Sequence, residues 1–231
     1  MIEINNVGKN YNMNVLTDVS LNIKKGEFVT FIGPSGCGKS TLLKICAGLV
    51  EPSVGEVSFD TDNKIGIVFQ DHVLLPWRTV RQNVELPKEL LGSDVDVMDT
   101  IKLVDLTEFA DSYPFELSGG MKQRVAIARA LVLHPNILMM DEPFGSIDEL
   151  MRNKLNMDLL RICKRLNPTV LFVTHSISEA VLLSDRVVIL SKRPGRVKDV
   201  IKIKLARPRS IDMKETQEFQ RYVRCIRKEI D

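Results

Sequence analysis

Short apolar runs recur along the chain and predict buried β-strands. Each run is apolar at consecutive positions and rich in β-branched residues, which is typical of strands covered on both faces of a sheet. These runs lie at Glu27–Ile32, Ile65–Phe69, Asn136–Met140, Thr169–Thr174 and Arg186–Leu190. Segments with helical spacing of apolar residues separate several of them, at Lys39–Ala47, Leu150–Leu166 and Ile177–Leu183. The alternation predicts an α/β fold with a mixed, mostly parallel sheet.

Three segments depart from this alternation. Apolar and polar residues alternate within the first 25 residues, which favours an N-terminal antiparallel β subdomain. The strand pattern disappears from Pro76 to about Leu133, where helical spacing predicts an inserted helical lobe. Near the end, apolar side chains at i, i+3, i+4 and i+7 predict an amphipathic helix over Met213–Ile230 that packs on the body. Those side chains are Phe219, Tyr222, Val223 and Ile226.

The order of these segments predicts a single domain over residues 1–231. Its core comprises residues 1–75 and 134–210 and includes the antiparallel sheet, residues 76–133 form the helical lobe, and residues 211–231 form the C-terminal helix. Hydrophobic residues make up 44% of the chain and charged residues 27%, which fits a globular protein with a sizeable core.

The net charge of +2 gives no overall reason to expect nucleic acid as a partner. The charge is unevenly distributed, because residues 192–231 hold 13 Lys or Arg against 6 Asp or Glu, and the rest of the chain holds 19 against 24. We interpret the basic tail as a solvated face of the C-terminal helix rather than as a binding patch.

The cysteines and the N-terminus bear on the cellular compartment. Cys37, Cys46, Cys163 and Cys225 have neither a zinc-ligand spacing nor the pattern of a disulfide framework, so reduced cytosolic thiols are expected. Long apolar runs and a basic-then-apolar leader are both missing from the sequence, so we expect neither a membrane span nor secretion.

A glycine-rich loop follows the first predicted core strand and precedes a helix, which is the context that the pattern G-x-x-x-x-G-K-[ST] requires. Its glycines let consecutive backbone N–H groups point at a polyphosphate, and the helix N-terminus adds its positive dipole end. The predicted nucleotide-binding residues here are Gly33, Pro34, Ser35, Gly36, Cys37, Gly38, Lys39, Ser40 and Thr41. Lys39 is expected to contact the β- and γ-phosphates, and Ser40 to ligate Mg²⁺.

Two acids end a later apolar strand, where a buried pair is costly without a cation. They are Asp141 and Glu142. We expect Asp141 to reach the Mg²⁺ and Glu142 to orient or deprotonate the attacking water. An acid pair at a strand end can also simply cap the next turn.

The octet Leu117–Arg124, with Ser118, Gly119 and Gly120, resembles the signature sequence of ABC-type ATPases. It lies between the phosphate loop and Asp141, in the order of that family. A serine and two glycines ahead of a helix at Met121–Leu131 form a second anion-binding helix terminus. The resemblance implies the ABC ATPase fold, with a P-loop NTPase core, and an ATP shared between the phosphate loop of one subunit and Ser118–Gly120 of another. Ser118 can serve equally as an N-cap of that helix.

The same resemblance implies roles for four further positions. Tyr11 matches an aromatic that stacks on adenine, and Gln70 matches a glutamine that senses Mg²⁺ and water. His175 matches the switch histidine that contacts the γ-phosphate. Asp148 is implied to bind the nucleotide. It ends the loop Gly145–Asp148, which departs from the family because Ser146 and Ile147 stand where members commonly have alanine and leucine.

Two segments, Gln70–Val80 and Leu190–Val197, look like the nitrate, sulfonate and taurine branch of bacterial importers. Trp77 is the only tryptophan, and an exposed aromatic there suits a protein contact. The alternative is that Trp77 packs inside the helical lobe.

The resemblance therefore implies an ATP-hydrolysing importer subunit that uses ATP and Mg²⁺ and forms a homodimer in the ATP-bound state. It implies integral membrane permease subunits contacted near Gln70–Val80, an extracytoplasmic solute-binding protein as an indirect partner, no nucleic acid, and a cytoplasmic, peripheral place on the inner face of the cell membrane. A soluble ABC ATPase acting on nucleic acid or ribosomes, and an ABC ATPase of lipid or lipoprotein traffic, are the alternatives.

Overall fold

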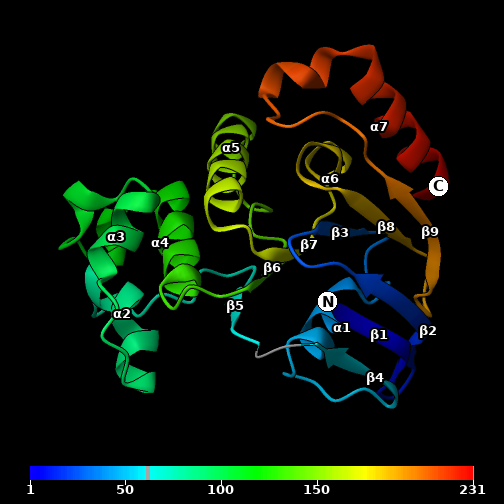
Figure 1. Cartoon of the computed structure of the whole chain (residues 1–231), viewed down its shortest axis with the longest axis horizontal. Coiled ribbons are helices and arrows are strands. Elements are labelled where there is room, and N and C mark those ends of the chain that lie inside the picture. Colours follow the sequence, from blue (N-terminus) through cyan, green and yellow to red (C-terminus); the bar gives the residue numbers. More distant parts are fainter. Residues whose placement is uncertain (61–62, 231) are drawn as a thin grey trace.

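A six-stranded sheet forms the centre of the computed structural model, which describes residues 1–60 and 63–230 (Figure 1). Its strand order is β5-β6-β7-β3-β8-β9; the first five of these run parallel, and β9 is antiparallel to β8. The strands are β5 (Ile65–Val68), β6 (Ile137–Asp141), β7 (Thr169–Val173), β3 (Phe28–Ile32), β8 (Arg186–Leu190) and β9 (Val197–Lys202). Every residue of β3, β6 and β7 is buried, which explains their continuous apolar sequence. The predicted α/β fold with a mostly parallel sheet is confirmed.

The two faces of this sheet are covered by different elements. Helix α1 (Lys39–Cys46) and a three-stranded antiparallel sheet of β2 (Asn14–Ile23), β1 (Ile2–Asn10) and β4 (Val54–Phe59) cover one face. Helices α5 (Glu149–Leu166), α6 (Ile177–Leu183) and α7 (Gln217–Ile230) cover the other (Figure 1). Successive residues of a strand therefore enter different cores.

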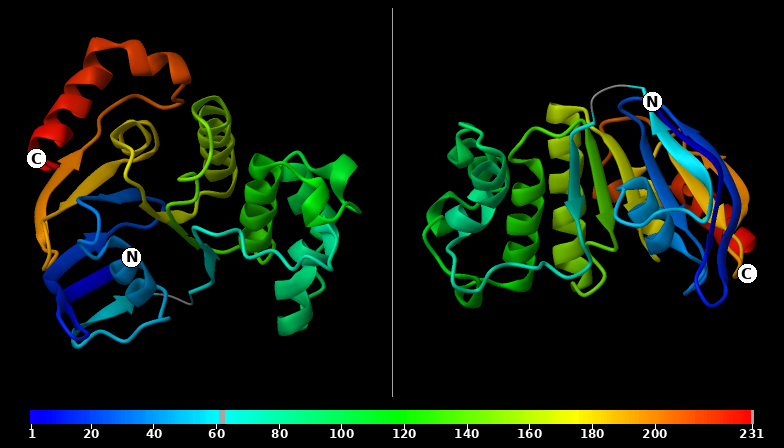
Figure 2. Two further views of the ribbon diagram at one scale, coloured as in Figure 1. Left: turned by 180° about the vertical axis from the view of Figure 1, so that it is seen from behind. Right: turned by 90° about the horizontal axis from the view of Figure 1, so that it is seen from below.

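A helical lobe projects from the edge of the central sheet, as Figures 1 and 2 show. It consists of α2 (Val80–Leu91), α3 (Val97–Leu103), two 3-10 turns (Thr107–Phe109 and Pro114–Glu116) and α4 (Gly119–Leu131). The chain enters the lobe from the edge strand β5 and returns to the neighbouring strand β6. Helix α4 packs against α5, so one continuous core joins the lobe to the sheet.

The C-terminal segment differs from its prediction at one end. The predicted helix starts at Met213, but a 3-10 turn (Ile211–Glu215) comes first and α7 begins at Gln217. Thr216 has an extended backbone and its hydroxyl accepts a hydrogen bond from the N–H of Phe219 at 3.3 Å, as an N-cap residue does. The four predicted apolar side chains of α7 are buried, and its arginines are exposed, as expected of a solvated basic face.

Two strands of the structure were not predicted, and β3, β5 and β7 are each one residue shorter than predicted. β4 and β9 lie at sheet edges and are only partly buried, so neither has the continuous apolar run of a core strand. The run predicted at Ile65–Phe69 stops pairing after Val68, and Phe69 is partly exposed. Among the described residues, no helix combines the length and apolar character needed to cross a bilayer.

Candidate functional site

The glycine-rich loop joins the carboxyl end of β3 to the start of α1, at the centre of the sheet. Gly36 (φ 73°) and Gly38 (φ 105°) both adopt left-handed backbone conformations that favour glycine. Gly38 is also the N-cap of α1, and no side chain caps that helix. The first N–H groups of α1 are thus left for an anionic partner, with the positive end of the helix dipole behind them.

Lys39 is only 6% exposed and lies against the glycine-rich loop. Its Nζ donates hydrogen bonds to the carbonyl oxygens of Gly33 (3.0 Å) and Pro34 (3.2 Å). Both partners are neutral, so the loop positions a buried cation without neutralising its charge. Lys39 forms no close ion pair within the part of the chain that the structure describes, although its charge acts on Asp141. A phosphate at this loop would supply a counter-charge in direct contact.

Ser40 and Asp141 lie together although 101 residues separate them, and the Ser40 hydroxyl donates to Asp141 Oδ1 at 2.8 Å. Asp141 ends β6 and is 7% exposed. Burial raises its pKa, whereas the Ser40 hydrogen bond and the charge of Lys44 lower the pKa. A hydroxyl beside a desolvated carboxylate suits Mg²⁺, which takes oxygen ligands and stabilises the ionised form of the acid. These two residues fit the metal that the sequence implies.

Glu142 and His175 also meet, from the ends of the adjacent strands β6 and β7. Nδ1 of His175 lies 3.1 Å from Oε2 of Glu142. Glu142 has a positive φ of 44°, and its N–H donates to the carbonyl of Val173 at 2.9 Å. Non-glycine residues in this conformation are strained and are enriched at functional sites. The acid that follows Asp141 is therefore turned away from the strand direction toward the histidine.

The structure does not bring the other predicted residues into contact with this cluster. Gln70 is exposed and follows the end of β5, although its neighbour Phe69 lines a small hollow together with Asp141. Tyr11 lies in the turn between β1 and β2 and is 56% exposed, with Lys9 Nζ 4.9 Å from its ring centre.

Ser118 and Asp148 act as N-caps in the described chain. Ser118 accepts from Met121 N at 3.3 Å at the start of α4, and Asp148 accepts from Met151 N at 3.0 Å at the start of α5. Gly119 is exposed, and Gly120 is packed so closely on Met151 that a Cβ there would lie 2.9 Å from a side-chain atom. The lobe carrying Ser118 projects away from the sheet centre that carries α1 (Figure 2). Within one chain, the serine and glycines do not complete the phosphate loop.

The segment that follows Gln70 is attached to the helical lobe. Arg129 of α4 donates to the carbonyl oxygens of His72 (2.8 Å) and Val73 (2.7 Å). Burial lowers the pKa of His72. Farther along, Trp77 is 70% exposed, so it is not part of the lobe's core.

The sequence did not predict the contacts between the phosphate loop and the turn that follows β8. Arg193 Nε donates to the carbonyl oxygen of Gly36 at 3.0 Å. The N–H of Gly195 donates to Val15 O at 2.9 Å, and a Cβ at Gly195 would come 2.1 Å from Cys37 O. The turn after β8 thus supports the phosphate loop from outside. Its Pro-Gly pair predicts a turn, but nothing in the sequence predicts what that turn contacts.

Comparison with known proteins places these features in one family. Residues 16–145 match the ABC transporter family. The chain is 45% identical over 235 residues to an aliphatic sulfonates import ATP-binding protein of Bacillus cereus, covering 96% of this chain and 94% of that protein. It is 46% identical over 219 residues to a nitrate import ATP-binding protein of Synechococcus elongatus, covering 88% of this chain and 33% of that protein.

Solved structures give the same result. A dimeric structure of the bacterial ABC transporter cassette MJ0796 matches with a TM-score of 0.78 and 36% identity, covering 89% of this chain and all of that one. A second dimeric structure of that cassette, in a post-hydrolysis state bound to ADP and Pi, matches with a TM-score of 0.76. The order of loop, signature and acid pair in the sequence, the fold and these matches agree, and the chain belongs to the ABC transporter family as an ATP-binding cassette.

Proposed function

We propose that the protein is the ATP-hydrolysing subunit of a bacterial importer, which energises uptake of a small anion through a separate permease. The observation that carries the ATPase assignment is the assembly of Ser40, Asp141 and Glu142 beside the loop that holds Lys39. The names of the sulfonate and nitrate relatives support an oxyanion of that type as solute. These names do not favour the alternatives, which are an ABC ATPase acting on nucleic acid or ribosomes and an ABC ATPase of lipid or lipoprotein traffic.

In the proposed mechanism, the loop and the Lys39 ammonium hold the phosphates of ATP. Ser40, Asp141 and Gln70 would hold Mg²⁺, which when bound neutralises developing charge on the transferred phosphoryl group. Glu142 takes a proton from the attacking water, and His175, 3.1 Å from that carboxylate, contacts the γ-phosphate. The site accelerates hydrolysis by position and charge, without a covalent intermediate.

The second half of each site comes from a second copy of this chain in the proposal. Ser118, Gly119 and Gly120 of one copy face the phosphate loop of the other, and Asp148 contacts the nucleotide across the interface. The dimeric state of the related cassette supports this arrangement. Loss of the bridging phosphate on hydrolysis then weakens the closed dimer, and this difference in affinity can drive a second conformation of a partner.

The proposed division of the chain follows these roles. Residues 1–75 and 134–210 form the nucleotide-binding core, residues 76–133 the lobe with the signature, and residues 211–231 the C-terminal helix; Asp231 lies outside the described residues. The proposed place of the protein is the cytoplasmic face of the cell membrane, where the permease holds it. A solute-binding protein on the other side of the membrane is an indirect partner.

The permease is proposed to dock near Gln70–Val80, with Trp77 as an exposed anchor. Trp77→Ala should leave basal ATP hydrolysis unchanged and remove most solute uptake and permease-stimulated hydrolysis when the transporter is reconstituted in vesicles. Phe109→Ala, which alters another exposed aromatic of the lobe, is the control and should preserve uptake.

Two results would contradict these proposals. Normal uptake by the Trp77 variant would contradict the docking site. Failure of the reconstituted wild type to take up any anion would contradict the importer assignment.

Tyr11 is proposed to stack on the adenine ring. Tyr11→Ala should raise the KM for ATP by about tenfold with little change in kcat, because stacking of one base on an aromatic ring contributes about 1–3 kcal/mol. Tyr11→Phe keeps the ring and should keep the KM near the wild-type value. A steady-state ATPase assay of the three proteins makes the comparison, and an unchanged KM in the alanine variant would assign the ring to the surface only.

A further inference from the structure

A cavity among the described residues lies away from the nucleotide site, at the opposite end of the strands. It has a volume of about 730 Å³ and is bounded by the amino ends of β3, β7 and β8, the second half of α5 and the segment 207–209. We call it the basal pocket. Its volume falls within the range of small-molecule sites in proteins.

The floor of the basal pocket is apolar. Phe28, Met157, Leu160 and Val170 line it, and they come from two strands and one helix of the same core. Cys163 also lines the pocket, and burial raises the pKa of its thiol to about 12, so the thiol adds no negative charge. The floor is therefore suited to the apolar body of a ligand.

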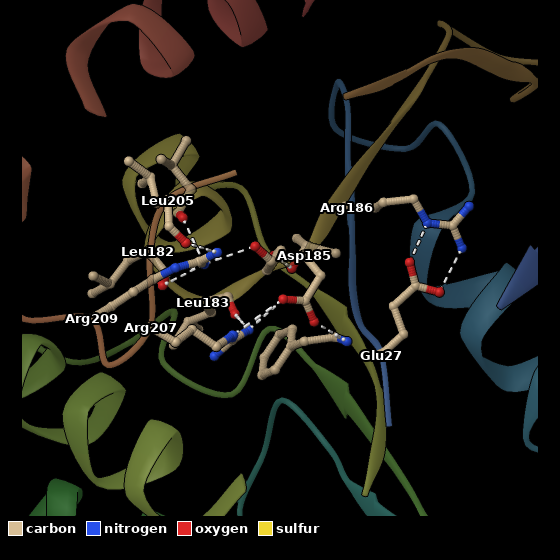
Figure 3. Close-up of polar contacts among 12 residues, drawn as sticks. Glu27, Leu182, Leu183, Asp185, Arg186, Leu205, Arg207 and Arg209 are labelled. Atoms are coloured by element: carbon tan, nitrogen blue, oxygen red, sulfur yellow. Dashed lines mark hydrogen bonds and ion pairs between the residues drawn. The ribbon is translucent and has the colours of Figure 1, made fainter. Parts of the chain in front are cut away.

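The charges that line the basal pocket are mostly positive. Arg161, Lys164, Arg207 and Arg209 face a single lining carboxylate, Asp185. Both oxygens of that carboxylate already accept a hydrogen bond. Oδ1 accepts from Arg207 at 2.8 Å, and Oδ2 accepts from the N–H of Phe28 at 2.9 Å. Figure 3 shows Asp185 beside the guanidinium of Arg207.

Two of the four cations form no ion pair with a carboxylate within residues 1–60 and 63–230. Arg209 is 4% exposed, and its guanidinium donates only to carbonyl oxygens, including those of Leu182 (3.0 Å) and Ser184 (2.8 Å), as Figure 3 shows for Leu182. Nε of Arg209 has no hydrogen-bond partner among the residues that the structure describes, and burial lowers the pKa of the guanidinium to about 10. Lys164 is exposed and forms no hydrogen bond or ion pair with any residue that the structure describes.

Arg161 and Arg207, in contrast, are paired. Arg161 donates to Asp105 at 2.8 Å, outside the pocket, and Arg207 to Asp185. The positive potential left in the pocket therefore belongs to Lys164 and Arg209, beside an apolar floor. An anion would lower the cost of the buried Arg209 charge, and a neutral ligand would not.

We propose that the basal pocket binds a small organic anion, whose acid group contacts Lys164 and whose apolar body lies on the floor formed with Phe28 and Leu160. The site is separate from the nucleotide site, since it adjoins the residues before β3 rather than the loop after it. Binding there does not depend on the solute or permease assigned above.

Two matched probes test the charge requirement on the full-length protein. Anilinonaphthalene sulfonate has an aromatic body and a sulfonate, and phenylnaphthylamine is the same body without the sulfonate. Fluorescence titration should show that Lys164→Gln weakens sulfonate binding about fivefold, as expected for one partly exposed charge contact, and leaves binding of the neutral probe unchanged. Lys154→Gln, an exposed lysine of the same helix that does not line the pocket, should change neither.

Methyl-labelled methionine locates the probe. In nuclear magnetic resonance spectra, the Met157 methyl signal, assigned with Met157→Leu, should move in proportion to bound sulfonate and should move less in Lys164→Gln at the same probe concentration. Equal sulfonate affinity in the wild type and Lys164→Gln would overturn the proposal. So would saturation with the sulfonate that leaves the Met157 signal in place, because the probe would then lie on another apolar surface.

Discussion

Glu142→Gln is expected to reduce ATP turnover by about a hundredfold or more, because a positioned general base contributes about that factor to proton transfer. The amide keeps the size and hydrogen-bonding reach of the side chain but cannot accept the proton of the attacking water. ATP binding should persist, so the variant should accumulate as an ATP-loaded dimer. Single-turnover hydrolysis measures the rate, and size-exclusion chromatography with ATP and Mg²⁺ measures the dimer.

The control for this variant is Glu108→Gln, which makes the same chemical change at an exposed position of the helical lobe. It should hydrolyse ATP at the wild-type rate and show no excess dimer. Near-normal hydrolysis by Glu142→Gln would contradict the assignment of Glu142 as the base. His175, whose Nδ1 lies 3.1 Å from the same carboxylate, would then be the next candidate for the base.

Lys39→Ala is expected to weaken ATP binding by at least about tenfold, since a charge-assisted hydrogen bond contributes about 1.5–3 kcal/mol. The substitution removes the buried ammonium and also leaves the carbonyls of Gly33 and Pro34 without their donor. A loss of stability of about 1–3 kcal/mol from those carbonyls should accompany it. Fluorescent-nucleotide titration measures the affinity, and thermal unfolding without nucleotide measures the stability.

Lys154→Ala removes an exposed helical lysine and serves as the control for affinity and stability. If Lys39→Ala bound and hydrolysed ATP as the wild type does, the glycine-rich loop would have to be read as a strand-to-helix turn without a ligand. A loss of stability with unchanged affinity would lead to the same conclusion, because Lys39 would then serve only the loop.

The parts of the fold that were predictable are those where burial alone determines the sequence. β7 is covered on both faces, so its continuous apolar run predicts it to within a residue. β9 pairs only with β8 and is partly buried, and its sequence Val-Lys-Asp-Val-Ile-Lys lacks both a continuous run and regular alternation. Edge strands of this kind are fixed by their hydrogen-bonding partner, which the local sequence does not specify.

Contacts within the site also differ in whether the sequence predicts them. The contact between Ser40 and Asp141 follows from the motif order. Ser40 starts the helix that the loop after β3 leads into, Asp141 ends the parallel strand β6, and their side chains meet at 2.8 Å. No motif predicts the contact between Gly195 and the phosphate loop, because this contact depends on how closely one turn approaches the backbone of Cys37. Sequence reasoning identified the groups proposed to carry the chemistry and missed the close approach of Gly195 to the loop.

The attachment of the helical lobe to strands β5 and β6 has a thermodynamic consequence. The chain that leaves β5 carries Gln70 and is then bonded to α4 through Arg129, whereas Asp141 stays at the end of β6. Rotation of the lobe would therefore change the separation of Gln70 and Asp141. Because Gln70 and Asp141 are both proposed to hold Mg²⁺, a partner that binds one orientation of the lobe would then change the affinity for the nucleotide. Nucleotide would in turn change the affinity for that partner by the same factor.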